Sequence, residues 1–128
     1  MIISFAWTTP ALLAGVKTVT RRTWNRRYAE QFARLVEFGG STRVDAYDRS
    51  PRNGGRKVAT IALVTVAHEQ GYRLTASDRE REGVTWSERN GIAVPEGAAT
   101  WDEWWRLFRD GWATAPEGGY RVEFELIG

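Results

Sequence analysis

Apolar residues alternate with polar ones, or follow one another, in four segments that are typical of β-strands: residues 2–7, 42–48, 58–66 and 120–126. Residues 58–66 are apolar at nearly every position, which predicts a strand that is covered on both faces. The Asn53–Gly54 pair lies between the second and third segments and predicts a hairpin turn that joins them.

Helix-capping residues and helical spacing predict four helices. The first begins at Thr9–Pro10 and ends at Gly15, and the second covers residues 28–38 and ends at Gly39–Gly40. The third begins after Thr75 and stops at Gly83, with Asp78 in its first turn. Residues 84–99 are rich in Gly, Pro, Asn and Ser, so we expect an irregular loop there.

The fourth helix follows a capping box formed by Thr100 and Glu103. Five of its residues form an aromatic stripe at helical spacing: Trp101, Trp104, Trp105, Phe108 and Trp112. Such a stripe could stack on nucleobases, but aromatic stripes on helices are more often core. We therefore expect this stripe to pack against the sheet.

The order of these elements predicts one α+β domain over residues 1–128, with a small, curved antiparallel sheet. Pairing of the first and last strands would close this sheet into a β-barrel and leave no exposed edge.

Composition excludes several kinds of site. There is no cysteine, which rules out disulfides, thiolate zinc sites and a cysteine nucleophile. A single histidine, His68, rules out histidine-cluster metal sites, and we expect no metal or cofactor. No apolar run approaches the ~20 residues of a membrane span, and the N-terminus lacks the basic lead of a signal peptide. We expect a cytoplasmic protein with no membrane partner.

Charge is distributed unevenly along the chain. Residues 1–57 contain eleven Lys and Arg against four Asp and Glu, whereas residues 58–128 contain seven against twelve. The balances are thus +7 and −5, for a net charge of +2. The basic half favours a phosphate-bearing ligand such as RNA, although a chance distribution of surface charge would look the same.

The basic half contains the most reactive segment of the chain, residues 15–24. Thr20 is a potential nucleophile, and Lys17 is an amine that could deprotonate it. Arg21 and Arg22 suit a phosphate or a polar base edge. The alternative is an ordinary β segment in which Lys17 is a solvated cation.

Residues 12–22, with their sequence Leu-Leu-Ala-Gly-Val-Lys-Thr-Val-Thr-Arg-Arg, resemble the turn-and-basic motif of the ASCH domain, a member of the PUA-like superfamily. Residues 58–66, 74–85 and 121–124 resemble the central strand, the acidic helix and the closing strand of that family, in the same order. The resemblance implies a small PUA-like β-barrel with flanking helices and a cleft for a nucleobase or RNA.

The resemblance also implies functional residues. Some family members are amidohydrolases that remove the acetyl group of N4-acetylcytidine with a Lys, a Thr and a Glu. On this sequence these residues are Lys17, Thr20 and Glu82. Thr20 would be the nucleophile, Lys17 its base and Glu82 a proton shuttle or leaving-group donor. A surface ion pair of Glu82 with Arg79 is the plain alternative.

The first hypothesis is therefore an RNA- or nucleotide-binding domain with a nucleobase-sized pocket. The residues expected to contact nucleic acid are Arg21, Arg22, Trp24, Arg26 and Arg27, because cations bind phosphates and a flat ring stacks on bases. The second hypothesis is a hydrolase, either an amidohydrolase acting on a modified nucleoside or a ribonuclease. The third is an accessory protein-interaction domain, which only the high tryptophan content favours.

Overall fold

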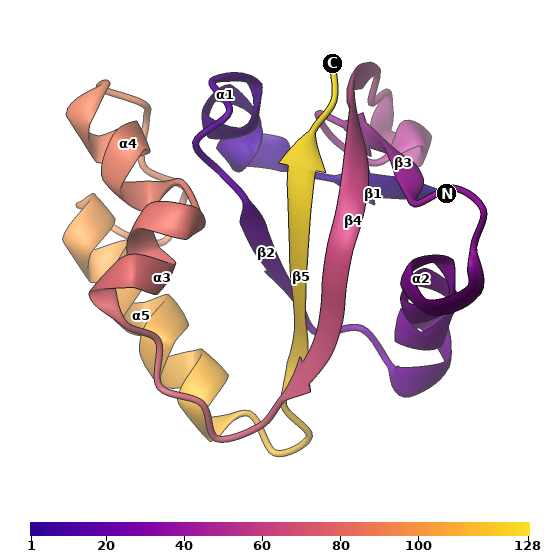
Figure 1. Ribbon diagram of the computed structural model, residues 1–128. Helices are drawn as coiled ribbons and strands as arrows, with labels where there is room; N and C mark the ends of the chain where they lie inside the picture. Colours follow the sequence, from indigo (N-terminus) through magenta and orange to yellow (C-terminus); the bar gives the residue numbers. More distant parts are fainter.

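Five strands form one curled sheet in the computed structural model of the chain, which describes residues 1–128 (Figure 1). The strands are β1 (Ile2–Ser4), β2 (Val19–Arg22), β3 (Arg43–Tyr47), β4 (Lys57–Glu69) and β5 (Gly119–Leu126). Their order across the sheet is β1-β3-β4-β5-β2. The predicted α+β class and the hairpin between β3 and β4 are confirmed.

The pairing of the strands differs from the expectation. β1 pairs with β3 in parallel, while the other neighbouring strands are antiparallel. β5 lies between β4 and β2. β1 cannot pair with β5, because β2 already occupies the free edge of β5. The predicted pairing of the first and last strands is therefore wrong, and so is an entirely antiparallel sheet. The sheet is a curled half barrel, and a closed barrel is not confirmed.

Six helical segments flank the sheet: the 3₁₀ turn η1 (Ala6–Thr8), α1 (Thr9–Leu13), α2 (Arg26–Phe38), α3 (Ala76–Arg81), α4 (Val84–Arg89) and α5 (Trp101–Thr114). A further 3₁₀ turn, η2 (Pro51–Asn53), lies within the β3–β4 connection. α2 covers one side of the sheet, and α3, α4 and α5 lie on the other side (Figure 1). None of the helices is long and apolar enough to cross a membrane.

Two predicted segments change type. The first strand stops at Ser4, and the chain then turns at Ala6, which has a φ of +48°. Residues 84–89, expected to be irregular, form α4. Gly83 joins α3 to α4 with a φ of +87°, so the glycine that ends one helix directly precedes the next.

The expectation that β4 is covered on both faces is wrong. Ala59, Ile61 and Leu63 are buried on the face that α2 covers, but Val64 is 49% exposed. The helices on the opposite side leave this middle part of β4 open to solvent. The apolar run at residues 58–66 therefore predicts the strand correctly but not the burial of its two faces.

The aromatic stripe is largely buried, as predicted, and Trp112 contacts the sheet at Glu69 of β4, but most of the stripe packs elsewhere. Trp101, Trp105 and Trp112 form a second core with Leu74 and Val84, separate from the main core at the sheet. This second core joins α5 to α4 and to the segment that precedes α3. The rings of Trp104 and Phe108 lie at its margin and are only partly buried.

Candidate functional site

A cavity of about 200 Å³ lies between the two edge strands of the half barrel, and we call it the seam cavity. Residues 4–8, which leave β1, line one side of it. The other sides are formed by Lys17, residues 20–22 of β2, Glu82, Trp104 and Phe108. The cavity therefore lies where the sheet does not close.

Lys17 and Glu82 are 65 positions apart in the sequence and meet at this cavity. The Lys17 Nζ donates to Glu82 Oε1 at 3.0 Å and to the Glu82 backbone oxygen at 2.9 Å. Lys17 is only 3% exposed. This burial lowers the pKa of Lys17 below its ordinary value, although the charge of Glu82 acts in the opposite direction.

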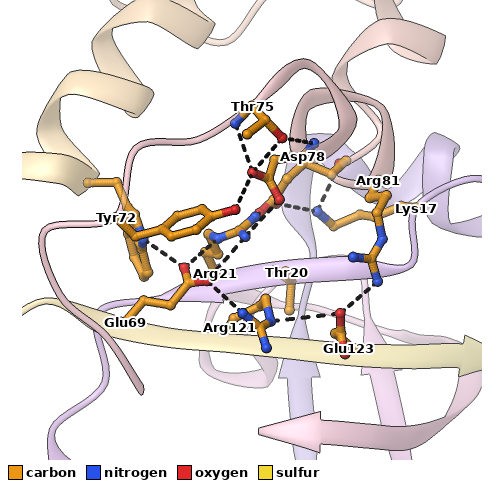
Figure 2. Close-up of polar contacts among 12 residues, drawn as sticks. Lys17, Thr20, Arg21, Glu69, Tyr72, Thr75, Asp78, Arg81, Arg121 and Glu123 are labelled. Atoms are coloured by element: carbon orange, nitrogen blue, oxygen red, sulfur yellow. Dashed lines mark hydrogen bonds and ion pairs between the residues drawn. The ribbon is translucent and has the colours of Figure 1, made fainter. Parts of the chain in front are cut away.

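Arg21 is the centre of a buried ion network (Figure 2). It donates to Glu69 Oε1 at 2.9 Å, to Asp78 Oδ1 at 3.0 Å and to Glu82 Oε2 at 2.9 Å. Burial lowers the pKa of Arg21, but the hydrogen bonds and charges of Glu69 and Glu82 outweigh it and raise the pKa above its ordinary value. Arg21 thus ties β2 to the end of β4 and to α3.

The carboxylates of this network have further partners. Glu69 accepts from Trp112 Nε1 at 3.0 Å and from Arg121 at 2.8 Å. Asp78 Oδ2 accepts from the Thr75 amide at 2.8 Å and from the Tyr72 hydroxyl at 3.1 Å. Burial raises the pKa of both acids, but these hydrogen bonds and Arg21 hold it below the ordinary value. Both carboxylates are therefore ionised at neutral pH.

Arg22 differs from its neighbour because no carboxylate lies within ion-pair distance of it. Its Nε donates to Thr20 Oγ1 at 3.1 Å, one Nη donates to the Ser4 backbone oxygen, and the guanidinium lies 5.5 Å from the centre of the Phe5 ring. Burial lowers the pKa of Arg22, against the attraction of the Glu82 charge. The side chain bridges the two edge strands across the seam cavity.

Thr20 lines the same cavity as Lys17 and Glu82 and is 4% exposed. No hydrogen bond joins its hydroxyl to Lys17; its one partner is Arg22. Figure 2 shows Thr20 on the other side of β2 from the Arg21 network. Successive residues of a strand point to opposite faces, which is why Thr20 and Arg22 share one face and Arg21 occupies the other.

The structure does not gather the five residues expected to bind nucleic acid. Arg21 and Arg22 both line the seam cavity, but the carboxylates of the ion network hold the guanidinium of Arg21. The Trp24 ring stacks on Phe32 at 4.4 Å, with 16° between their planes. Arg26 and Arg27 are exposed at the start of α2, where they line two different hollows.

Comparisons of the chain with protein-family models, characterised proteins and solved structures found no match.

The sequence analysis did not identify Glu69 and Asp78, although both contact Arg21. Asp78 was recognisable as a helix-capping residue, and the side chain that caps α3 also holds Arg21. Glu69 ends β4 with no local signal, and only the fold brings it to Arg21.

The seam cavity combines a cation with free donors and walls of aromatic rings. A guanidinium has five N–H donors, and Arg22 uses two of them on Thr20 and Ser4. The Trp7 and Trp104 rings are 4.4 Å apart, and Trp104 stacks on Phe108 at 5.2 Å. Such a cavity suits a flat ligand that carries an oxygen acceptor or a negative charge.

Proposed function

We propose that this chain is an ASCH-type domain whose seam cavity binds one nucleobase of a modified nucleoside or of RNA. The observation that carries this proposal is the state of Arg22, a largely buried cation without an acidic partner at the wall of a cavity. A buried charge is costly unless it is paired, and a carbonyl oxygen or an anion of the ligand would supply the missing partner.

The size and the walls of the cavity support a single heterocycle. Sites for drug-sized ligands have volumes of roughly 300–1,000 Å³, whereas the seam cavity has about 200 Å³. Trp7, Trp104 and Phe108 offer flat aromatic surfaces at its wall. A base that enters the cavity beside these rings would replace water against them while its carbonyl oxygen accepts from Arg22.

Titration of the protein with the four ribonucleosides and with N4-acetylcytidine, followed by tryptophan fluorescence, tests this proposal. The fluorescence responds because Trp7 and Trp104 line the cavity. We expect Arg22→Gln to weaken binding at least tenfold, while Arg27→Gln, the same change on the exposed start of α2, leaves it unchanged. Far-UV circular dichroism shows that both variants are folded. Equal affinity in the two variants, or no binding of any nucleoside, nucleotide or short RNA, refutes the proposal.

A second candidate function is hydrolysis of an acylated nucleoside, and two observations favour it. The burial that lowers the pKa of Lys17 favours the neutral form of its amine, the form that can accept a proton. Arg22 donates to Thr20 Oγ1 and would stabilise the oxygen as it loses its proton. Thr20 Oγ1 would attack the acyl carbon, its proton would pass to Lys17, and cytidine would leave with a proton. Water would then release acetate from the acyl-threonine.

Glu82 takes a different part in this reaction from the proton shuttle that the family resemblance implies. Its Oε1 accepts from Lys17 and its Oε2 from Arg21, so both carboxylate oxygens are occupied by cations. Neither carboxylate oxygen is therefore free to approach a leaving group. We propose that Glu82 orients the Lys17 amine, and that Lys17 carries the proton to the leaving group.

Incubation with N4-acetylcytidine, with cytidine release followed by chromatography, tests the hydrolase. We expect release that is lost in Thr20→Ala and kept in Thr18→Ala, which removes the same group two positions away, outside the residues that line the seam cavity. Release that survives in Thr20→Ala would exclude Thr20 as the nucleophile. No release from protein that binds the nucleoside would leave binding as the function.

A further inference from the structure

A second hollow, of about 590 Å³, lies where the chain passes from β2 to α2. Residues 23–26 form one side of it. His68 near the end of β4, residues 117–118 and Tyr120 at the start of β5 form the other. We call it the β2–α2 hollow. None of the residues that line it belongs to the Arg21 ion network or to the seam cavity.

Three aromatic rings line this hollow and are held in place. Trp24 stacks on Phe32. The His68 Nε2 lies 2.9 Å from the Glu117 backbone oxygen, and because a carbonyl oxygen only accepts, this nitrogen is the donor. The His68 ring also contacts Tyr120 at 5.2 Å between ring centres. Rings that are already fixed lose little freedom when a base stacks on them.

The charge of the hollow favours an anion on one side. Arg26 lines it at the start of α2, and its side chain is 85% exposed. Its one ion pair, with Glu30 at 3.0 Å, is exposed to solvent and contributes little. The first turn of α2 contains no acidic residue, so no carboxylate there offsets the partial positive charge of the helix end. Glu117 lies in the same hollow and disfavours an anion on its own side.

The seam cavity and the β2–α2 hollow are lined by residues that follow one another in the chain. Arg22 lines the cavity, Thr23 lines the hollow, and Arg22 is paired in register with Tyr120. β2 ends at Arg22, so the residues that line the hollow begin directly after a residue that lines the cavity. A ligand that runs along this segment of the chain would contact the seam cavity and then the β2–α2 hollow.

We propose that the β2–α2 hollow binds the neighbouring nucleotide of a single-stranded RNA whose base occupies the seam cavity. Its base stacks on the rings of the hollow, and Arg26 binds a phosphate. This inference rests on the proposed function and narrows it, because the preferred ligand is then an oligonucleotide and not a free nucleoside. The inference also gives the two neighbouring arginines different roles: Arg26 contacts the RNA, and Arg27 does not.

Affinity measured as a function of ligand length tests this inference. Each of the four ribonucleosides is compared with its 3′-monophosphate and with the homotrinucleotide RNA of the same base. We expect the trinucleotide to bind at least tenfold more tightly than the nucleoside. His68→Ala is expected to remove most of this gain, because one base–aromatic stack changes affinity by roughly 5- to 150-fold.

Salt dependence provides a readout that a loss of packing would not change. We expect Arg26→Ala to reduce the slope of log K against log salt by ~0.7 for the trinucleotide, the value for one phosphate contact of a single strand. Arg27→Ala removes the same charge from the next position and should leave the slope unchanged. Neither variant should alter nucleoside binding.

The outcomes separate the two proposals. A nucleoside that binds as tightly as its trinucleotide overturns the second site and leaves the seam cavity as the whole site. Equal losses in Arg26→Ala and Arg27→Ala also overturn it, because they would show a diffuse effect of charge. Absence of binding by nucleoside and trinucleotide alike refutes the proposed function itself.

Discussion

Replacement of Arg21 by methionine tests whether the buried network holds the site together. The change keeps an unbranched side chain of similar length and removes the guanidinium, whose side chain is only 1% exposed. Three carboxylates, those of Glu69, Asp78 and Glu82, then lose a cation that lies 2.9–3.0 Å from each of them. We expect a large loss of stability with the fold otherwise preserved.

The magnitude follows from what each carboxylate retains. Glu69 keeps Arg121 and Trp112, Asp78 keeps its bonds to residues 72 and 75, and Glu82 keeps Lys17. The cost should therefore be close to that of one broken buried pair, ~3–5 kcal/mol, and not three times as much. A domain of this size has a total stability of roughly 5–15 kcal/mol, so the variant should fold but with little reserve.

Urea unfolding followed by circular dichroism measures this loss. With a denaturant slope of about 2 kcal/mol per molar, a loss of ~4 kcal/mol lowers the midpoint by ~2 M. Arg26→Met is the matched control, since its side chain is 85% exposed and should change the midpoint little. A loss below ~1 kcal/mol in Arg21→Met would refute the idea that the network stabilises the fold.

The pH dependence of this loss gives a second test. Folded Glu69 and Asp78 have pKa values below the ordinary 4.5 and 3.8, so each contributes stability that is complete above those values. The contribution is lost as the pH falls through the lower, folded pKa values. The difference between wild type and Arg21→Met should thus be full at pH 6–7 and should shrink below about pH 4. A difference that stays constant down to pH 3 would contradict the assignment.

Two further variants test the elements around the cavity. Gly83→Ala should cost ~1–3 kcal/mol in urea unfolding, because the added Cβ would lie 2.6 Å from the Ala11 Cβ and 3.2 Å from the Lys17 Cβ, at a φ of +87°. Gly71→Ala is the control that isolates the backbone strain, since Gly71 has a φ of +68° and no neighbour within 4 Å. The lowered pKa of Lys17 predicts that stability rises as the pH approaches 10.5, since the folded protein loses this proton before the unfolded chain does. Lys17→Met should abolish that rise, and an unchanged profile would argue against a perturbed amine.

Local patterns of the sequence predicted most of the elements but not the order of the strands. Alternation located β3 and β5, helical spacing located α2, and helix caps located α3 and α5. Strand order depends on contacts between distant segments: β1 pairs with β3, and the last strand takes the place between β4 and β2. Composition could not predict α4 either, because the glycine before it serves as a joint between two helices.

The candidate site was predictable where its residues lie in one short segment. Lys17, Thr20 and Arg22 come from residues 15–24 and all line the seam cavity. The sequence could not distinguish the roles of Arg21 and Arg22, because the two look alike until the carboxylates of β4 and α3 are in place. Nor could it separate Arg26 from Arg27, which the start of α2 directs to different hollows.

Strand geometry explains how two adjacent arginines come to differ. In β2 the side chains of Arg21 and Arg22 point to opposite faces, and α3 with the end of β4 supplies acids to only one of these faces. Arg21 is therefore held by carboxylates, while Arg22 at the open seam bonds only to neutral oxygens. A one-residue shift of β2 against β5 would exchange the two. The register that fixes the core, with Thr20 opposite Val122, thus also leaves one arginine with free donors for a ligand.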